Sequence, residues 1–255
     1  MLGLGTSLVH GNLAQEVPYG LNFTASSSQY VNVGDDNSLS FGDGSDDTPM
    51  TISMWVRLDL SATGSGAADR GLLVKGEEYG LWVDNQYNKP FFVRDDVHPG
   101  GYLRRTTDND SPLTHNTWHH IVVVSDDSED DDGIKIYIDN SQVSTTKFAQ
   151  DYTASHNTSA DLQIGRGINS STNQMGSTFV YAEGDISNVA MWNKVLDATA
   201  VATLYNGGKI YDIATGLGTN LVAWWPFNEG SGTSAADGSS NSNTGTLTNS
   251  PTWLS

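Results

Sequence analysis

Short runs of alternating apolar and polar residues recur along this chain. The clearest is MTISMWVRL at 50–58, where Ile52, Met54, Val56 and Leu58 fall on one face. A period of two is that of a β-strand with one buried face. Further runs of strand length are QYVNV, GLLVK, YGLWVDN, PFFVRDD, TWHHIVVVSD, GIKIYIDNSQV, DLQIGRG and DISNVAMWN. Gly, Asn, Asp and Ser separate these runs, so the pattern predicts an antiparallel β protein.

One segment has the spacing of a helix instead. Its apolar stripe consists of Leu196, Ala200, Val201 and Leu204. Asp197 can cap the first turn, and Gly207 is a stop signal. Many strands with one short helix predict an all-β fold, an antiparallel β-sandwich of the jelly-roll type.

The charge of the chain limits its partners. Thirty acidic residues against twelve basic ones give a net charge of −18. Phosphate backbones and anionic membranes repel such a surface, so we expect no nucleic-acid partner. No apolar run approaches the ~20 residues of a membrane span, so we expect no membrane insertion. The first twenty residues lack a basic region followed by a long apolar run, so we expect no signal peptide.

The order of the strand motifs resembles a known family. GLNFTASSSQYVNVG is similar to the opening edge strands of laminin-G-like, concanavalin A-like lectin/glucanase domains. Their later signatures resemble, in order, MTISMWVRL, LLVKGEEYGLWVDN, NTWHHIVVVSD, IKIYIDNSQV, LQIGRG and GDISNVAMWNKVLDATAVATLYNGG. The resemblance covers roughly residues 19–207 and implies a sandwich of the concanavalin A type.

The tract LVAWWPFNEGSGTSAADGSSNSNTGTL resembles a segment that comes first in many members, but here it comes last. One interpretation is that the C-terminus folds back and supplies strands of the same sandwich, as in a circular permutation. Trp224, Trp225 and Phe227 would then be core or inter-sheet residues. The other is the start of a second, truncated module. We favour the first, because a tryptophan pair on a tail would be an unusual exposed apolar patch.

The predicted organisation is therefore an N-terminal arm at 1–18 and one sandwich at 19–255, which residues 223–255 complete. The start MLGLGTSLV and the LVAWW tail also resemble structural proteins of tailed bacteriophages, especially marine ones. This resemblance implies a virion protein made in the host cytoplasm, as a capsid decoration, fibre or tail-associated component. Its partners would be other virion proteins or further copies of itself, as a homo-oligomer. The apolar anchors of the arm would be Leu2, Leu4, Leu8 and Val9.

The alternative function is a secreted or cell-surface carbohydrate-binding module. The sandwich glycosidases of this family carry E-x-D-x-x-E on one strand, and none of the six glutamates here builds that motif. G-x-S-x-G and H-E-x-x-H are absent as well. We therefore predict a non-catalytic protein, with a glucanase as a third hypothesis. His119 and His120 alternate along a strand, so they are not a chelating pair.

Calcium is the candidate cofactor, because it prefers carboxylate, amide and carbonyl oxygens on a curved loop. The tract ADGSSNSNTG resembles the metal-associated loop of the family. Its candidate ligands are Asp237, Asn241 and Asn243. Thr244 and the pair Ser187–Asn188 depart from the acidic residues that members carry there. A second acidic loop, SDDSEDDDGIK, offers Asp130 and Asp132, but it lacks the closing glutamate of a calcium loop.

A glycan site, including one for host surface polysaccharide, needs exposed aromatic rings beside polar groups. The candidates are Tyr87, Tyr102 and Arg104, the last two from the polar loop RDDVHPGGYLRR at 94–105. Trp82 lies within a strand, so we expect it in the core.

Overall fold

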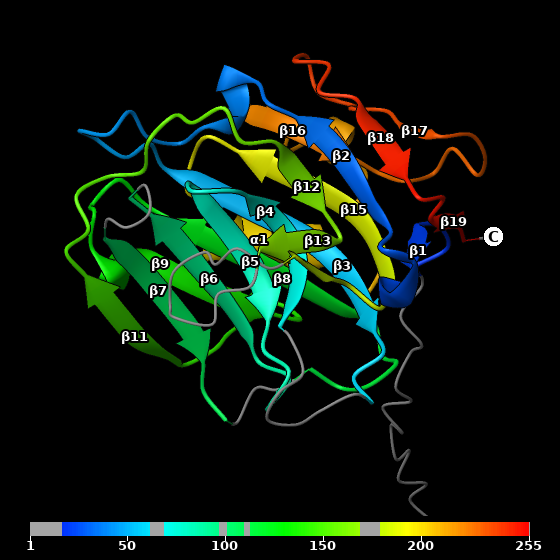
Figure 1. Ribbon diagram of the computed structural model, residues 1–255, viewed down its shortest axis with the longest axis horizontal. Helices are drawn as coiled ribbons and strands as arrows, with labels where there is room; N and C mark the ends of the chain where they lie inside the picture. Colours follow the sequence, from blue (N-terminus) through cyan, green and yellow to red (C-terminus); the bar gives the residue numbers. More distant parts are fainter. Residues whose placement is uncertain (1–16, 62–68, 97–100, 110–112, 169–178, 255) are drawn as a thin grey trace, which may run out of the picture.

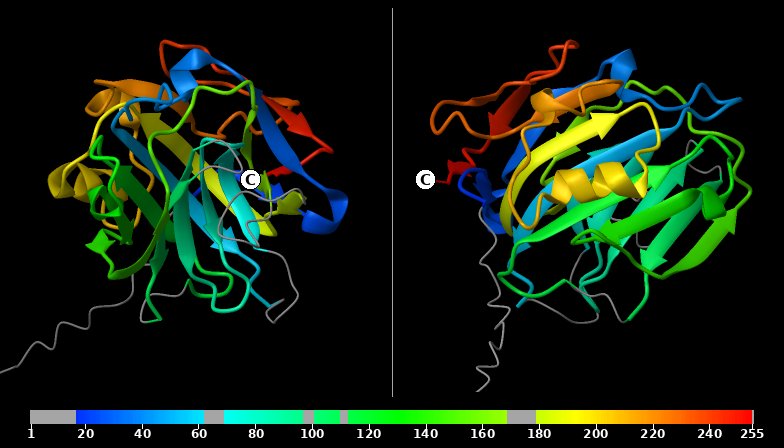
Figure 2. Two further views of the ribbon diagram at one scale, coloured as in Figure 1. Left: turned by 60° about the vertical axis from the view of Figure 1, so that its left-hand side comes forward. Right: turned by 180° about the vertical axis from the view of Figure 1, so that it is seen from behind.

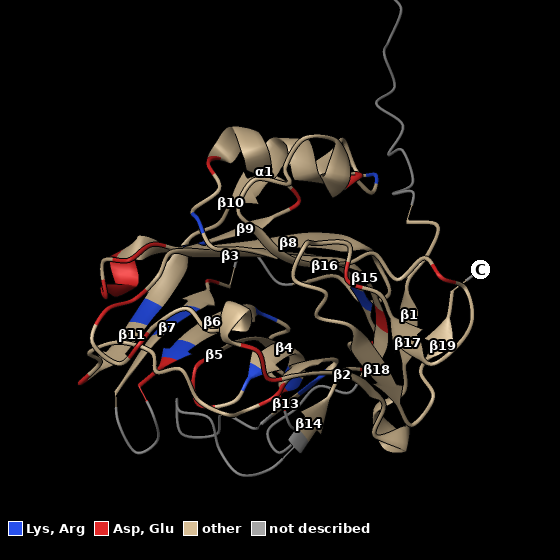
Figure 3. Cartoon of the chain, turned by 90° about the horizontal axis from the view of Figure 1, so that it is seen from above, with Lys and Arg blue, Asp and Glu red and all other residues tan. Residues whose placement is uncertain are grey.

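The computed structural model describes residues 17–61, 69–96, 101–109, 113–168 and 179–254. These residues form two stacked antiparallel sheets with one short α-helix (Figure 1). The predicted all-β sandwich is confirmed. Helix α1 (Ala198–Tyr205) lies outside one sheet, and a hairpin of β13 (Arg166–Ile168) and β14 (Phe179–Tyr181) lies outside the other (Figure 2, Figure 3). Among the described residues, no helix is long and apolar enough to cross a bilayer.

The first sheet has eight strands in the described ranges. They are β1 (Leu21–Phe23), β3 (Met50–Leu58), β8 (His119–Ser125), β9 (Ile134–Ile138), β10 (Ser141–Gln142), β15 (Gly184–Trp192), β16 (Leu221–Trp225) and β19 (Thr252–Trp253). Their order is β10-β9-β8-β3-β15-β1-β19, and β16 also pairs with β15. The longest strands, β3 and β15, therefore lie in the middle of this sheet.

The second sheet has nine strands in the same ranges. They are β2 (Tyr30–Gly34), β4 (Arg70–Lys75), β5 (Tyr79–Val83), β6 (Pro90–Asp95), β7 (Tyr102–Thr107), β11 (Thr145–Gln150), β12 (Leu162–Ile164), β17 (Ser234–Ala235) and β18 (Gly245–Thr248). Their order is β11-β7-β6-β5-β4-β12-β2-β18-β17, which leaves β11 at one edge. Single turns of 3-10 helix occur at Ala25–Ser27, Asn37–Leu39, Asp131–Gly133 and Ile213–Thr215.

Strand β3 shows how far its alternation determines its surroundings. Ile52 and Met54 are buried in the core between the sheets, as a period of two predicts. Trp55 points to the other face and is also fully buried. Its ring stacks on His120, with centroids 5.0 Å apart, and on Tyr205 of α1, with centroids 5.8 Å apart. The helix therefore covers a face that an isolated sandwich would leave in water.

Helix α1 begins and ends with local side-chain and backbone signals. The Asp197 carboxylate accepts a hydrogen bond of 2.8 Å from the Ala200 N–H, which satisfies a donor of the first turn. Asn206 follows the last turn in the left-handed conformation, with φ of 48°, one residue before the predicted stop at Gly207. Asparagine tolerates this conformation better than most residues, so the helix ends there.

The C-terminal residues contribute strands to both sheets. Strand β16 pairs with β15, β18 with β2, and β19 with β1, so the orange and red segments lie beside the blue ones in Figure 1. Trp225 and Phe227 are buried in the core between the sheets. Trp224 points outward and packs beside Trp192 and Leu221.

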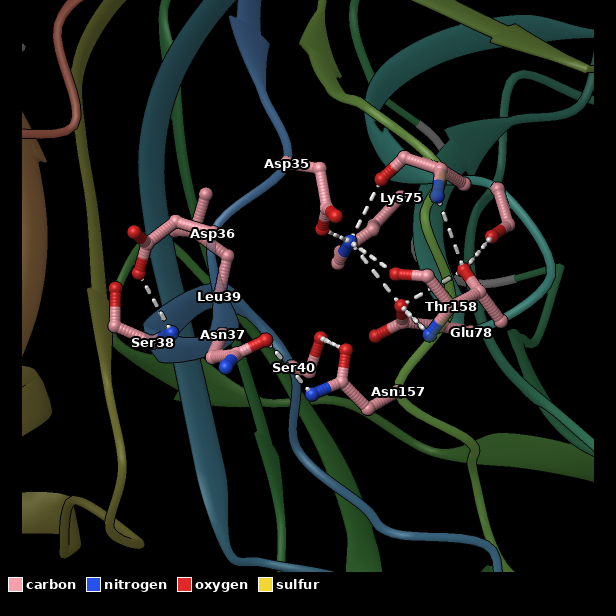
Figure 4. Close-up of polar contacts among 12 residues, drawn as sticks. Asp35, Asp36, Asn37, Ser38, Leu39, Ser40, Lys75, Glu78, Asn157 and Thr158 are labelled. Carbon is pink, nitrogen blue, oxygen red and sulfur yellow. Dashed lines mark hydrogen bonds and ion pairs between the residues drawn. The ribbon is translucent and has the colours of Figure 1, made fainter.

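A buried ion cluster joins three segments at one end of the nine-stranded sheet (Figure 4). The Lys75 ammonium lies 2.7 Å from an Asp35 carboxylate oxygen, 3.1 Å from Glu78 Oε1 and 2.6 Å from the Ala160 carbonyl oxygen. Glu78 Oε1 also accepts hydrogen bonds from the backbone N–H and the hydroxyl of Thr158. The side chains of Lys75 and Glu78 have no exposed surface, so the Glu78 carboxylate depends on Lys75 for neutralisation.

Candidate functional site

A cavity of about 430 Å³ opens at the β11 edge of the nine-stranded sheet. Leu103 belongs to the core between the sheets, so its neighbour Arg104 points to the outer face of this sheet. Arg104 lines the cavity, which we call the edge pocket. Its main lining residues are Asp69, Asp84, Tyr87, Lys89, Arg104, Thr106, Thr107 and Phe148.

Arg104 lies between two aromatic rings. Its guanidinium carbon is 4.0 Å from the centroid of Phe91 and 5.8 Å from that of Phe148, which is its direct cross-strand partner. Its Nε donates a 3.0 Å hydrogen bond to the Thr106 hydroxyl. Burial lowers the pKa of the Arg104 guanidinium, and nearby carboxylates oppose that shift. Ring stacking and the hydrogen bond to Thr106 therefore hold this cation in position.

The turn between β5 and β6 presents Tyr87 to the pocket. The Asp84 carboxylate accepts hydrogen bonds from the backbone N–H groups of Gln86, Tyr87 and Lys89, at 3.0, 2.6 and 3.1 Å. Such side-chain to backbone bonds fix a short turn. The Tyr87 side chain itself remains 53% exposed. The Lys89 ammonium lies 4.9 Å from the centroid of its ring.

Asp69 is the second carboxylate of the pocket. It accepts a 3.3 Å hydrogen bond from the Asn85 N–H. Burial raises the pKa of the Asp69 carboxyl above its ordinary value, whereas the Asn85 N–H and the Arg104 charge act in the opposite direction. The pocket thus combines carboxylate acceptors, cationic donors and exposed rings, which is the set of groups that binds a polyhydroxylated ligand.

The structure brings together two of the three predicted glycan residues. Tyr87 and Arg104 both line the edge pocket. Tyr102 does not: it is only 6% exposed and packs in an apolar cluster with Trp82 and Val180. The expectation that Tyr102 is a surface residue was wrong, because its side chain packs in this apolar cluster on the outer face of the sheet.

Sequence reasoning missed Phe148. This side chain is 43% exposed and lines the pocket opposite Arg104. Strand β11 is exposed along its length and carries no alternating apolar pattern, so it gave no strand signal. A lone phenylalanine within the polar run TTKFAQ was the available indication.

The predicted calcium loop is held by hydrogen bonds of the chain itself. Asp237 Oδ1 accepts from the backbone N–H groups of Trp224 and Ser239, both at 2.8 Å. Asp237 Oδ2 accepts from the Ser239 hydroxyl at 2.7 Å and the Asn243 N–H at 2.8 Å. The Asn241 side-chain amide donates to the Val222 carbonyl oxygen at 2.8 Å. In this arrangement Asp237 organises the loop, and a bound calcium there remains a prediction.

Asn188 replaces an acidic residue of the family pattern and has a structural role. It is buried at an irregularity in the pairing of β15 with β3 and has a φ of 47°. Its Oδ1 accepts a 2.7 Å hydrogen bond from the Trp224 indole N–H. Its Nδ2 donates to the Tyr211 carbonyl oxygen at 3.4 Å. The residue therefore joins β15 to the C-terminal strands.

The other acidic loop gathers three carboxylates that could hold calcium. One carboxylate oxygen from each of Asp130, Asp131 and Asp132 lies within 4.8 Å of the others. Basic groups already contact this triad: the Lys147 ammonium is 3.4 Å from Asp131, and the Arg105 guanidinium pairs with Asp132. A cation would have to compete with these two side chains.

The two adjacent histidines point in opposite directions, as predicted. His119 Nδ1 lies 2.7 Å from an Asp139 carboxylate oxygen. His120 Nε2 lies 2.8 Å from the Ser53 hydroxyl, and burial lowers the pKa of His120 to about 3. Ser53 and His120 are each 1% exposed, beneath Tyr205 of α1. This serine–histidine pair has no access to a substrate, so it belongs to the packing of the sheet.

Comparison with solved structures places this fold among known sandwiches. A candidate carbohydrate-binding protein from Bacteroides ovatus has a TM-score of 0.61 and 14% identity, over 92% of this chain and 59% of that protein. A pentraxin from Limulus polyphemus has a TM-score of 0.41 and 13% identity, over 75% and 84% of the two chains. A domain of an extracellular arabinanase from Geobacillus stearothermophilus, solved with arabinotriose, has a TM-score of 0.41 and 12% identity, over 64% and 69%.

The chain thus spans about 59% of the Bacteroides protein, and at this identity the likeness concerns the fold. No curated protein matches the sequence. The family model of the concanavalin A-like lectin/glucanases superfamily matches residues 25–202, which is more than half of the chain. Together with the two-sheet sandwich, this match shows that the chain belongs to the concanavalin A-like lectin/glucanases superfamily.

Proposed function

We propose that this protein is a non-catalytic carbohydrate-binding module and that it binds glycans in the edge pocket. One observation carries the proposal. Among the described residues, Tyr87, Phe148 and Val195 are the large apolar side chains with the most exposed surface, and the first two line the same polar cavity. Sugar C–H faces stack on such rings, while hydroxyl groups pair with the surrounding carboxylates and cations.

The comparisons support this class of function without specifying a ligand. The family contains lectins and glucanases, and the similar Bacteroides protein is described as a candidate carbohydrate-binding protein. Catalysis would require a carboxylate that is free to act as nucleophile or acid. The Asp84 carboxylate is instead held by three backbone N–H groups of its own turn. The sequence also lacks the glycosidase motif, so we propose binding rather than hydrolysis.

The test is glycan binding by the purified chain, first on an array and then by calorimetry with the best ligand. Phe148→Ala and Tyr87→Ala should each weaken binding about tenfold, which corresponds to about 1.4 kcal/mol. Val195→Ala is the matched control, because Val195 is equally exposed but does not line the pocket. Equal affinities of all four proteins would refute this location, and no binding by any of them would refute the function.

The virion role suggested by the sequence remains a hypothesis beside this one. The anchors of its predicted arm at 1–18 are Leu2, Leu4, Leu8 and Val9, and they lie outside the described residues, which begin at residue 17. The two roles are compatible, because a virion protein could use the edge pocket to adhere to host polysaccharide. The mass in solution of the full chain and of a chain lacking residues 1–18 tests the assembly role. A defined oligomer that the shorter chain does not form would support it, and two monomers would refute it.

A further inference from the structure

We infer that the edge pocket selects neutral glycans and rejects sugars that carry a carboxylate, such as uronic and sialic acids. This inference rests on the proposed function. It begins with the charges of the pocket, where the cations Lys89 and Arg104 face the carboxylates Asp69 and Asp84. The two positive and two negative charges cancel within the cavity, whereas the whole chain carries a net charge of −18. An acidic glycan therefore meets no local excess of positive charge and a repulsive field around the pocket.

Both cations already have partners within the protein. The Arg104 guanidinium carbon lies 4.0 Å from the Phe91 centroid and 5.8 Å from the Phe148 centroid, and its Nε donates to Thr106. Bidentate capture of a carboxylate through the Nε side of the guanidinium is therefore blocked. The Lys89 ammonium lies over the Tyr87 ring and donates to the Asn109 side-chain oxygen at 3.3 Å.

An added carboxylate would also face the two carboxylates of the pocket. Asp69 is partly desolvated, and like charges in such surroundings repel more strongly than in water. A neutral sugar avoids this cost, because each hydroxyl can donate to Asp69 and accept from a cation. Stacking on Tyr87 and Phe148 requires no charge on the ligand.

The experiment compares matched pairs of oligosaccharides that differ only by oxidation of C6. Suitable pairs are gluco- and glucurono-, galacto- and galacturono-, and manno- and mannurono-oligomers. For each pair that binds, we expect the neutral member to bind at least about tenfold more tightly. Asp69→Asn should reduce this difference in affinity between the neutral and the acidic member to about threefold. Asp127→Asn is the control, because it removes an equal charge from an exposed position outside the pocket.

A second measurement remains informative if Asp69→Asn does not fold. Added salt screens repulsion between exposed charges. The affinity difference between neutral and acidic oligosaccharides, measured on the natural protein, should therefore shrink when salt is raised from about 20 mM to about 500 mM. An acidic member that binds as tightly as its neutral counterpart would overturn the inference while leaving the proposed function in place. An affinity difference that changes neither with Asp69→Asn nor with salt would also overturn the inference. If no oligosaccharide of either kind binds, the proposed function itself fails.

Discussion

Replacement of Lys75 by methionine tests the buried ion cluster. Methionine has a similar length and no charge, so the variant leaves the Glu78 carboxylate without its nearest cation, at 3.1 Å. Glu78 has no exposed side-chain surface, and its Oε2 has no hydrogen-bond partner among the described residues. Removing one partner of a buried pair costs about 3–5 kcal/mol. We expect the free energy of unfolding to fall by about that amount at pH 7.

The pH dependence supplies an independent check. Burial raises the pKa of Glu78 above its ordinary value of 4.5, and Lys75 acts in the opposite direction. Without Lys75 the pKa of Glu78 rises further, so above pH 4.5 the folded variant binds more protons at Glu78 than the unfolded chain does. A raised acid pKa gives stability that is present below the unfolded value and lost as the pH rises through the folded value. The deficit of Lys75→Met relative to the natural protein should therefore shrink between pH 7 and pH 4.5.

Urea unfolding followed by tryptophan fluorescence at both pH values measures this deficit. The double variant Lys75→Met with Glu78→Gln removes both charges and keeps a carbonyl oxygen for the two Thr158 donors. It should recover most of the loss at pH 7. A deficit below about 1 kcal/mol at pH 7, or one that is equal at both pH values, would show that the pair is not buried as described.

Three further predictions concern other polar groups. The folded pKa of His120 is about 3 and the ordinary value is 6.5, so acid favours the unfolded chain between these two pH values. His120→Gln should therefore reduce the slope of the unfolding free energy against pH in this range, by up to about 1.4 kcal/mol per pH unit. An unchanged slope would contradict the burial of His120. Asp237→Ala removes four hydrogen bonds and should cost about 2–4 kcal/mol in urea titrations, whereas a loss under about 0.5 kcal/mol would show that the loop forms without it. Asn188→Ala should lower the melting temperature more than Asn188→Gly, because only glycine accepts the left-handed backbone freely, and the reverse order would refute that reasoning.

The resemblance to the superfamily and the alternation of β3 predicted the sandwich correctly, since a period of two with apolar residues on one face allows few other folds. The helix was also predictable, because Asp197 and the apolar stripe are local signals. Strand β11 was not. Its residues are exposed and obtain their conformation from pairing with β7, a contact that no local pattern encodes.

The candidate site was only partly accessible from the sequence. Tyr87 follows an aspartate that builds a turn, and turns lie on the surface, so its exposure could be expected. Tyr102 comes from the same polar loop as Arg104, and only its packing in the apolar cluster with Trp82 and Val180 decides that it is buried. Phe148 becomes a pocket residue through its register opposite Arg104, which lies 44 residues earlier in the chain.

By itself, the sequence determined the class of fold, the strongly acidic surface and the absence of glycosidase and hydrolase motifs, because composition, period and motif spacing are properties of neighbouring residues. The tertiary structure decided which outward-facing side chains reach water. Helix α1 buries Trp55, an apolar cluster on the outer face buries Tyr102, and the edge position of β11 leaves Phe148 exposed. These outcomes depend on which distant segment packs against each face, and that is settled only when the two sheets, the helix and the hairpin assemble together.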